Sequence, residues 1–182
     1  MKYNEYNYSN WESKAQTHDE NEIGEYLLNH CEDKFSLPNL TNILHIGLGS
    51  NSLYNQLKIK YLFDYTGLTK TILEYENVLP LQSCNYKCML MDKYNPKLSN
   101  MLNMYDFIVD NNIASYADSE GEALGFFGLL LNCLNKNGKL LTHNLGLQYK
   151  RPANINSMLT ELKLENEFKV NSLNGVVIIE KI

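Results

Sequence analysis

A glycine turn that follows an apolar run is the first part of this sequence with the residue types for ligand binding. Residues 42–51, NILHIGLGSN, predict a buried strand that ends in a turn made by Gly47 and Gly49. Glycine lets the backbone reverse with no side chain in the way. The helix predicted for residues 50–58 would point its first N–H groups at this turn, where they attract a carboxylate or another acceptor-rich group. A turn of this kind is also common as a purely structural feature.

Polar side chains stand at the ends of four later apolar segments as well. They are Thr69 to Glu74, Asp92 with Lys93, Asp110 to Asn112, and His143 with Asn144. In an open α/β sheet the ligand lies outside the carboxyl ends of the strands, where the strand order reverses. Carboxylates at such an edge accept hydrogen bonds from hydroxyl and amine groups, and a histidine there is a candidate base. The polar strand ends therefore predict a ligand pocket at one edge of a sheet.

Strand-like and helix-like segments alternate along the chain, which is the arrangement needed to bring these strand ends together. The predicted strands are 43–46, 60–68, 86–91, 105–109 and 138–142, and the predicted helices are 50–58, 72–81, 121–134 and 155–164. The alternation implies a mostly parallel sheet. Asn174-Gly175 between two apolar runs, 168–173 and 176–182, predicts a closing antiparallel hairpin.

Residues 1–38 predict a helical preface or lid before the sheet. Apolar residues recur at helical spacing between residues 20 and 30, and Asp19 with an acid three residues later is a predicted helix N-cap. The lone tryptophan, Trp11, would either pack this preface onto the body or close over a ligand. We therefore predict two regions, the preface and a single α/β domain over residues 39–182.

The composition bounds the possible partners and the compartment. A net charge of −5, with Arg151 as the single arginine, argues against a nucleic-acid partner. No apolar run reaches the ~18 residues of a membrane helix, and the polar start has no signal-peptide core. We expect a cytoplasmic protein with no membrane partner. Cys84 and Cys88 are spaced too widely for the usual zinc pair, so we expect reduced thiols and no metal.

Taken in order, these motifs resemble the class I S-adenosylmethionine-dependent methyltransferases. The resemblance covers about residues 40–182 and consists of IGLGSN, a polar end at strand two, Asp92 after strand three, YDFIVDN at strand four, and the closing hairpin. It implies a three-layer Rossmann-like fold of the α/β class, with a mostly parallel twisted sheet that ends in an antiparallel hairpin. It also implies S-adenosylmethionine as the cofactor, with the glycine turn under its methionine part and Asp92 accepting from the adenine amine.

The chain departs from the family pattern at three positions. His45 stands where the family usually has an acid that helps to hold the ammonium end of the cofactor. Asn51 replaces a third small residue of the turn, which is tolerable because asparagine enters the left-handed region more readily than most residues. Thr69 stands where an acid for the ribose hydroxyls is expected.

A nearby glutamate compensates for the missing ribose ligand. Gly67-Leu68-Thr69 followed by Glu74 is similar to the cyclopropane fatty-acid synthase branch of the family, which makes Glu74 the predicted ribose ligand and Asp64 the reserve. The predicted cofactor-binding residues are His45, Gly47, Gly49, Asn51, Thr69, Glu74, Asp92 and Asp110.

The implied reaction is in-line transfer of a methyl group to a small molecule. Asn111 and Asn112 are predicted to hold the acceptor group, and His143 is the predicted base. Two alternatives stay open: an aminopropyltransferase-like enzyme on the same fold, and a non-catalytic S-adenosylmethionine-binding or partner subunit, since His45 and Thr69 replace expected acids. The sequence identifies neither the methyl acceptor nor the oligomeric state.

Overall fold

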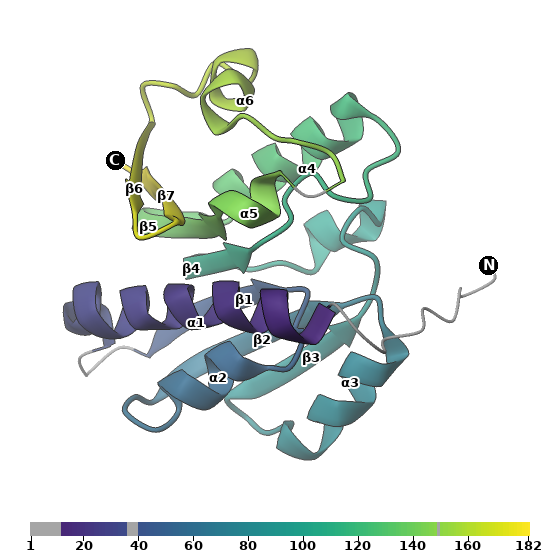
Figure 1. Cartoon of the computed structure of the whole chain (residues 1–182), viewed down its shortest axis with the longest axis vertical. Coiled ribbons are helices and arrows are strands. Elements are labelled where there is room, and N and C mark those ends of the chain that lie inside the picture. The colour runs from purple at the N-terminus through teal and green to yellow at the C-terminus, as the bar shows by residue number, and fades with distance from the viewer. Residues whose placement is uncertain (1–11, 36–39, 149) are drawn as a thin grey trace.

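The computed structural model describes residues 12–35, 40–148 and 150–182, which form one seven-stranded sheet with helices on both of its faces (Figure 1). The strand order is β3-β2-β1-β4-β5-β7-β6. In this order the neighbouring strands from β3 to β5 run parallel, and β7 is antiparallel to both β5 and β6. The strands are β1 Thr41–Ile46, β2 Phe63–Thr69, β3 Tyr86–Leu90, β4 Tyr105–Asp110, β5 Leu134–His143, β6 Phe168–Leu173 and β7 Val176–Lys181. The predicted fold class is confirmed.

The described residues also form six α-helices and three short 3-10 helices. The α-helices are α1 Glu12–His30, α2 Ser52–Leu57, α3 Ile72–Val78, α4 Glu120–Asn132, α5 Asn144–Leu147 and α6 Ile155–Glu161. The 3-10 helices are η1 Glu32–Phe35, η2 Leu79–Leu81 and η3 Pro96–Asn100. Ser119 caps α4 by accepting a hydrogen bond from the N–H of Glu122 at 3.1 Å, which satisfies one of the free donors at the helix start.

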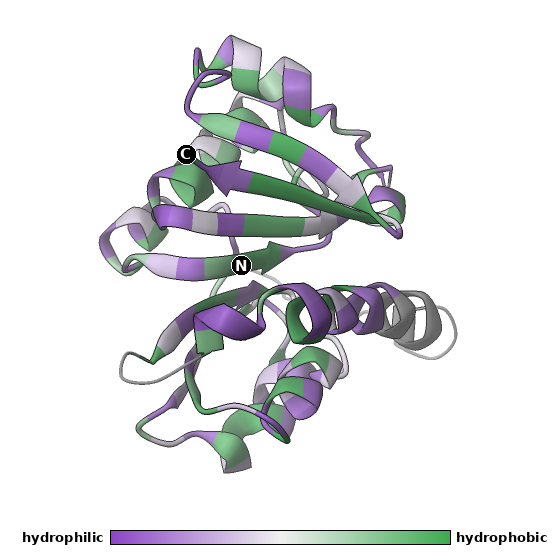
Figure 2. Cartoon of the chain, turned by 90° about the vertical axis from the view of Figure 1, so that its left-hand side faces the viewer, coloured by the Kyte–Doolittle hydropathy of each residue, from purple (hydrophilic) through white to green (hydrophobic). Residues whose placement is uncertain are grey.

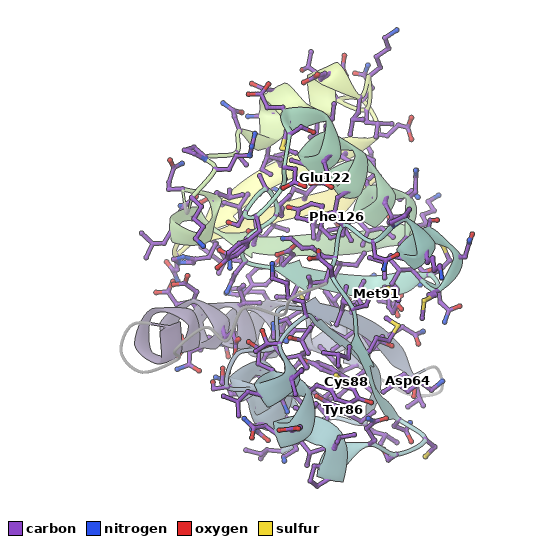
Figure 3. All side chains as sticks on the ribbon, turned by 90° about the vertical axis from the view of Figure 1, so that its right-hand side faces the viewer. Asp64, Tyr86, Cys88, Met91, Glu122 and Phe126 are labelled. Atoms are coloured by element: carbon purple, nitrogen blue, oxygen red, sulfur yellow. The ribbon has the colours of Figure 1, made fainter. Side chains whose placement is uncertain are left out.

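The two faces of the sheet pack into two separate apolar clusters. Ile43 points into the cluster that includes Leu27 of α1 and Leu53 of α2, whereas its neighbour Leu44 points into the cluster around Phe126 of α4. This follows from the alternation of side chains along a strand. Tyr86 and Phe126 belong to different clusters, and Figure 3 shows Phe126 in the upper part of the view and Tyr86 in the lower part. The core thus fixes which strand residues face which helix layer.

The edge strand β6 and its inner neighbour β7 differ in their pattern of polar and apolar residues. Figure 2 shows a continuous apolar stretch along β7 and alternating polar and apolar residues along β6. A strand buried on both faces needs apolar residues throughout, and an edge strand needs them on one face only. In the part of the chain that the structure describes, no helix is both long and apolar enough to cross a membrane.

The strand order reverses at β1, which pairs with β2 on one side and β4 on the other. Directly after this strand the chain turns through Gly47 and Gly49, whose φ angles of 74° and 50° lie in the left-handed region. A β-carbon added at Gly47 would have nothing within 4 Å, so this glycine borders open space. The reversal point of such a sheet is where a ligand is expected.

Two local predictions need correction, and one helix was not predicted. α1 begins at Glu12, so Asp19 lies inside the helix and is not its N-cap. β5 begins at Leu134 rather than at residue 138, because a register shift lets Leu134 pair with Tyr105 ahead of the regular ladder. The short helix α5 was not predicted. Trp11 lies outside the described residues, so its predicted packing or lid role stays a prediction.

Candidate functional site

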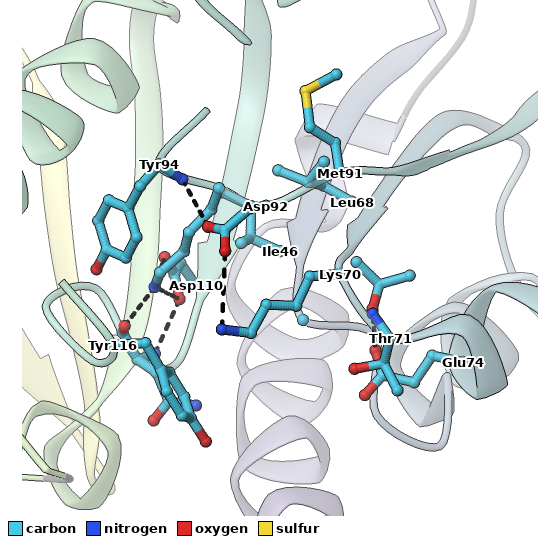
Figure 4. Close-up of a pocket in the computed structure, with 14 residues that line it drawn as sticks. Ile46, Leu68, Lys70, Thr71, Glu74, Met91, Asp92, Tyr94, Asp110 and Tyr116 are labelled. Carbon is cyan, nitrogen blue, oxygen red and sulfur yellow. Dashed lines mark hydrogen bonds and ion pairs between the residues drawn. The ribbon is translucent and has the colours of Figure 1, made fainter. Parts of the chain in front are cut away.

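A pocket opens at the carboxyl ends of β1, β2, β3 and β4, at the reversal point (Figure 4). It encloses about 840 Å³ of empty space when its open mouth is included. Strand register builds one wall, because Ile46 pairs with Leu68 on one side and with Asp110 on the other, and all three side chains line the pocket. The site is therefore an apolar surface with polar groups along its rim.

Glu74 joins the glycine turn to the end of β2. It lies in the first turn of α3 and is buried, and its Oε2 accepts hydrogen bonds from the N–H of Leu48 at 3.1 Å and from the hydroxyl of Thr69 at 2.6 Å. A carboxylate is favoured at a helix start, where free N–H groups point outward. Thr69 thus orients the Glu74 carboxylate, and both residues line the pocket.

Asp92 lies on the opposite side of the pocket, after β3. Its carboxylate accepts a hydrogen bond from the N–H of Tyr94 at 3.0 Å and lies 3.8 Å from the ammonium group of Lys70. About half of the Asp92 side chain is exposed, so one oxygen can still turn toward a ligand. The structure therefore brings three acids of the predicted set, Glu74, Asp92 and Asp110, to one pocket with Gly47, Thr69 and Asn112.

Lys93 and Asp110 form a buried ion pair in the pocket wall. The ammonium nitrogen lies 2.9 Å from Oδ2 of Asp110 and also donates to the carbonyl of Asn112, and Asp110 accepts the N–H of Asn112 at 2.9 Å. The Asp110 side chain is 2% exposed and that of Lys93 12%. Burial lowers the pKa of Lys93, and the facing Asp110 carboxylate opposes that change. Lys93 and Asp110 were both predicted to lie at strand ends, but their pairing was not predicted, because a lysine side chain beside Asp92 has no fixed direction.

Four predicted residues lie away from the pocket lining. His45 points to the α1 face because Ile46, its neighbour in the strand, points into the pocket. Its Nδ1 lies 2.6 Å from the hydroxyl of Tyr65, and burial lowers the pKa of His45 to about 3. Asn51 has φ 58° and accepts a hydrogen bond from the Tyr86 hydroxyl at 3.2 Å. Gly49 and Asn111 are outside the lining too, although Asn111 is buried with neither amide atom hydrogen bonded to any described residue.

His143 also lies outside the pocket, which corrects its predicted position as a base. Its Nε2 lies 2.6 Å from Oε2 of Glu22, and its Nδ1 accepts the N–H of Leu145 at 3.3 Å. Asp19 approaches the same Nδ1 at 3.3 Å. Both ring nitrogens are therefore occupied by α1 and by the start of α5. The imidazole anchors α1 to the end of β5.

A third acid of α1 is buried against the start of α2. Oε2 of Glu20 accepts hydrogen bonds from the N–H of Ser52 at 3.2 Å and from the Ser52 hydroxyl. Its other oxygen lies 3.9 Å from Nε2 of His45. Burial raises the pKa of Glu20 to about 8, and the two hydrogen bonds from Ser52 oppose that rise. Neutral Glu20 and neutral His45 are thus the forms that this interior favours.

Comparison with known proteins gives likeness at the level of the fold. No family model matches the sequence, and no curated protein matches it. The N-methyltransferase NodS from Bradyrhizobium japonicum WM9, solved with S-adenosyl-L-homocysteine, superposes with a TM-score of 0.62 at 13% identity over 94% of this chain and 91% of that one. A S-adenosylmethionine-dependent methyltransferase from Clostridium acetobutylicum ATCC 824 gives 0.64 at 11% identity, with coverages of 90% and 92%.

The CurJ carbon methyltransferase is similar over a smaller share of its own length. It gives a TM-score of 0.60 at 14% identity, and the match covers 90% of this chain and 54% of that one. These three structures share an architecture with this chain at identities too low to carry over residue roles. The chain has the Rossmann-like fold of S-adenosylmethionine-dependent methyltransferases.

Proposed function

We propose that this protein is a S-adenosylmethionine-dependent methyltransferase that acts on a small molecule, and that the cofactor binds in the pocket at the carboxyl ends of β1 to β4. The observation that carries the proposal is the convergence of Glu74 and Asp92 on the open space beside Gly47. Two acids on opposite sides of one pocket fit the ribose hydroxyls and the adenine amine, which are donors. The apolar wall fits the planar faces of the base.

The roles follow from where the side chains lie. Glu74 would bind the ribose hydroxyls, with Thr69 as its positioning residue, and Asp92 would accept from the adenine amine. The similarity of the segment around Glu74 to the cyclopropane fatty-acid synthase branch supports this role. Gly47 would leave room for the methionine part. Residues 39–182 would form the cofactor-binding domain, and residues 1–38 would be a helical preface or lid.

Methyl transfer from S-adenosylmethionine requires little acid catalysis from the protein. When bound, S-adenosylmethionine supplies a methyl group on a positively charged sulfur, which is already a good leaving group. The residues of this chain would hold the acceptor in line and exclude water. Asn112 lines the pocket and is the proposed contact for the acceptor. His45, Gly49, Asn51, Asn111 and His143 would support the site from behind rather than touch the cofactor.

Aminopropyl transfer is less well supported by the charges of the pocket. A polyamine acceptor is a polycation and needs carboxylates to bind it. Asp110, the acid at the strand end where such a contact is expected, is already neutralised by Lys93 at 2.9 Å. A partner subunit with no cofactor site differs from the proposed enzyme in a measurable way, because it should bind neither S-adenosylmethionine nor S-adenosylhomocysteine. A non-catalytic subunit that binds S-adenosylmethionine differs from it in transferring no methyl group.

We expect the substitution Glu74→Gln to weaken binding of S-adenosylhomocysteine by roughly 10- to 100-fold, since a hydrogen bond to a charged group is worth about 1.5–3 kcal/mol. Isothermal titration calorimetry of the two proteins measures this difference. Glu76→Gln is the matched control, because Glu76 is exposed on the same helix. No binding by the wild-type protein, or equal binding by the Glu74 and Glu76 variants, would overturn the proposal.

A further inference from the structure

Two lysines from distant parts of the chain meet at one tyrosine beside the pocket. The ammonium groups of Lys70 and Lys150 lie 4.2 Å and 3.8 Å from the ring centroid of Tyr116. Lys70 follows β2, Tyr116 follows β4, and Lys150 lies between α5 and α6. Figure 4 shows Lys70 and Tyr116 together in the pocket lining. We call these three residues the cationic mouth.

The arrangement of the cationic mouth is costly in two ways. Tyr116 and Lys150 have φ angles of 67° and 55°, in the left-handed region that non-glycine side chains avoid. The two ammonium groups also lie close to the same ring, at 4.2 Å and 3.8 Å from its centroid, so they are near enough to repel each other. Backbone strain and like charges brought together are features that accumulate at binding sites.

The surrounding charges make this gathering of cations unusual for the chain. The protein has more acidic than basic residues, 21 against 16. A third basic residue, Arg151, nevertheless follows Lys150 in the chain and donates to the carbonyl of Ala117, next to Tyr116, at 3.1 Å. Asp92 lies 3.8 Å from Lys70 of the mouth, and this acid is the residue assigned above to the adenine amine. Once Asp92 turns to the cofactor, the positive charge of Lys70 is less compensated.

We propose that the cationic mouth binds the acceptor substrate, and that this acceptor carries a carboxylate or a phosphate group. The identification of this anion as the methyl acceptor rests on the proposed methyltransferase function. Tyr116 lines the same pocket as Asn112, so an anion held here lies next to the proposed acceptor contact. Lysines placed around a pocket raise the local concentration of anions and bind them through charge-assisted hydrogen bonds.

The test uses the full chain without cofactor and two probes, inorganic phosphate and citrate, titrated by calorimetry at low ionic strength. We expect at least one probe to bind, and Lys150→Gln to weaken that binding by about fivefold or more, the equivalent of roughly 1 kcal/mol for a partly screened charge. Lys70→Gln should act in the same direction. Lys163→Gln is the matched control, because Lys163 is an exposed lysine that also has a positive φ, 59°, at a site away from the pocket.

The tighter of the two probes identifies the group, phosphate or carboxylate, that the mouth prefers. Absence of binding by both probes, or equal binding by the wild-type protein and the Lys150→Gln variant, would overturn the inference. S-adenosylhomocysteine binding, measured separately, tests the proposed function. Anion binding at the mouth without S-adenosylhomocysteine binding would leave the anion site in place and remove the methyltransferase assignment.

Discussion

Replacement of Lys93 by methionine is expected to lower the free energy of unfolding by about 3–5 kcal/mol, because it strands a buried carboxylate. Asp110 is 2% exposed and has Lys93 as its ion-pair partner at 2.9 Å. Methionine retains much of the volume of the lysine stem but cannot compensate the charge. Urea denaturation at neutral pH, followed by circular dichroism, gives the difference between the two proteins.

Two further variants separate the lost charge from lost packing. Lys97→Met removes an exposed lysine from the neighbouring 3-10 helix and should change stability little. The double variant with Asp110→Asn and Lys93→Met removes the stranded charge and should recover part of the lost stability. The recovery is partial because the N–H of Asn112 loses its charged acceptor. A double variant no more stable than Lys93→Met would show that the loss comes from packing rather than from the unpaired carboxylate.

The substitution Glu20→Gln is expected to stabilise the protein at pH 8 and to have little effect near pH 4.5, which inverts the usual result of removing a buried acid. Burial raises the pKa of Glu20 from 4.5 to about 8, so between these values the folded chain keeps a proton that the unfolded chain has lost. Stability therefore falls as the pH rises through this range. Since one pKa unit corresponds to about 1.4 kcal/mol, the wild-type protein should lose on the order of 4–5 kcal/mol in total.

Glutamine keeps an oxygen for the two hydrogen bonds from Ser52 and has no proton to lose. Urea midpoints for both proteins at half-unit steps from pH 5 to pH 8 should diverge steadily, with the variant more stable at the upper end. Glu25→Gln, an exposed change on the same helix, should follow the wild-type curve. Parallel curves for wild type and Glu20→Gln would show that Glu20 ionises in the folded protein as readily as in the unfolded one.

The fold was predictable because its local signals agree with one another. The apolar run before Gly47 and the hairpin turn at Asn174-Gly175 each fix a strand boundary with no information from elsewhere in the chain. Boundaries set by tertiary contacts were missed. The early start of β5 at Leu134 depends on its pairing with Tyr105, which is far away in sequence. Local patterns cannot carry that information.

The candidate site divides in the same way. Strand alternation decides that Ile46 faces the pocket and His45 does not. Comparison with the family's motif cannot make this distinction, because both residues directly precede the glycine turn. The polar strand ends and the family resemblance predicted Glu74 and Asp92 near one pocket, and both residues line it. The pairing of Lys93 with Asp110 was missed because a long side chain can reach in many directions, and only the buried Asp110 selects one.

The anchoring of α1 has a consequence for the order in which this chain can mature during synthesis. α1 contacts β5 and β7, and a β-carbon added at Gly175 would lie 2.4 Å from the imidazole of His143 and 3.0 Å from Glu22. α1 thus packs against a hairpin that is translated well after it. Until residues 176–181 have been made, the apolar side chains of Ile23 and Leu27 have only part of their final surroundings, which leaves apolar surface exposed on the nascent chain.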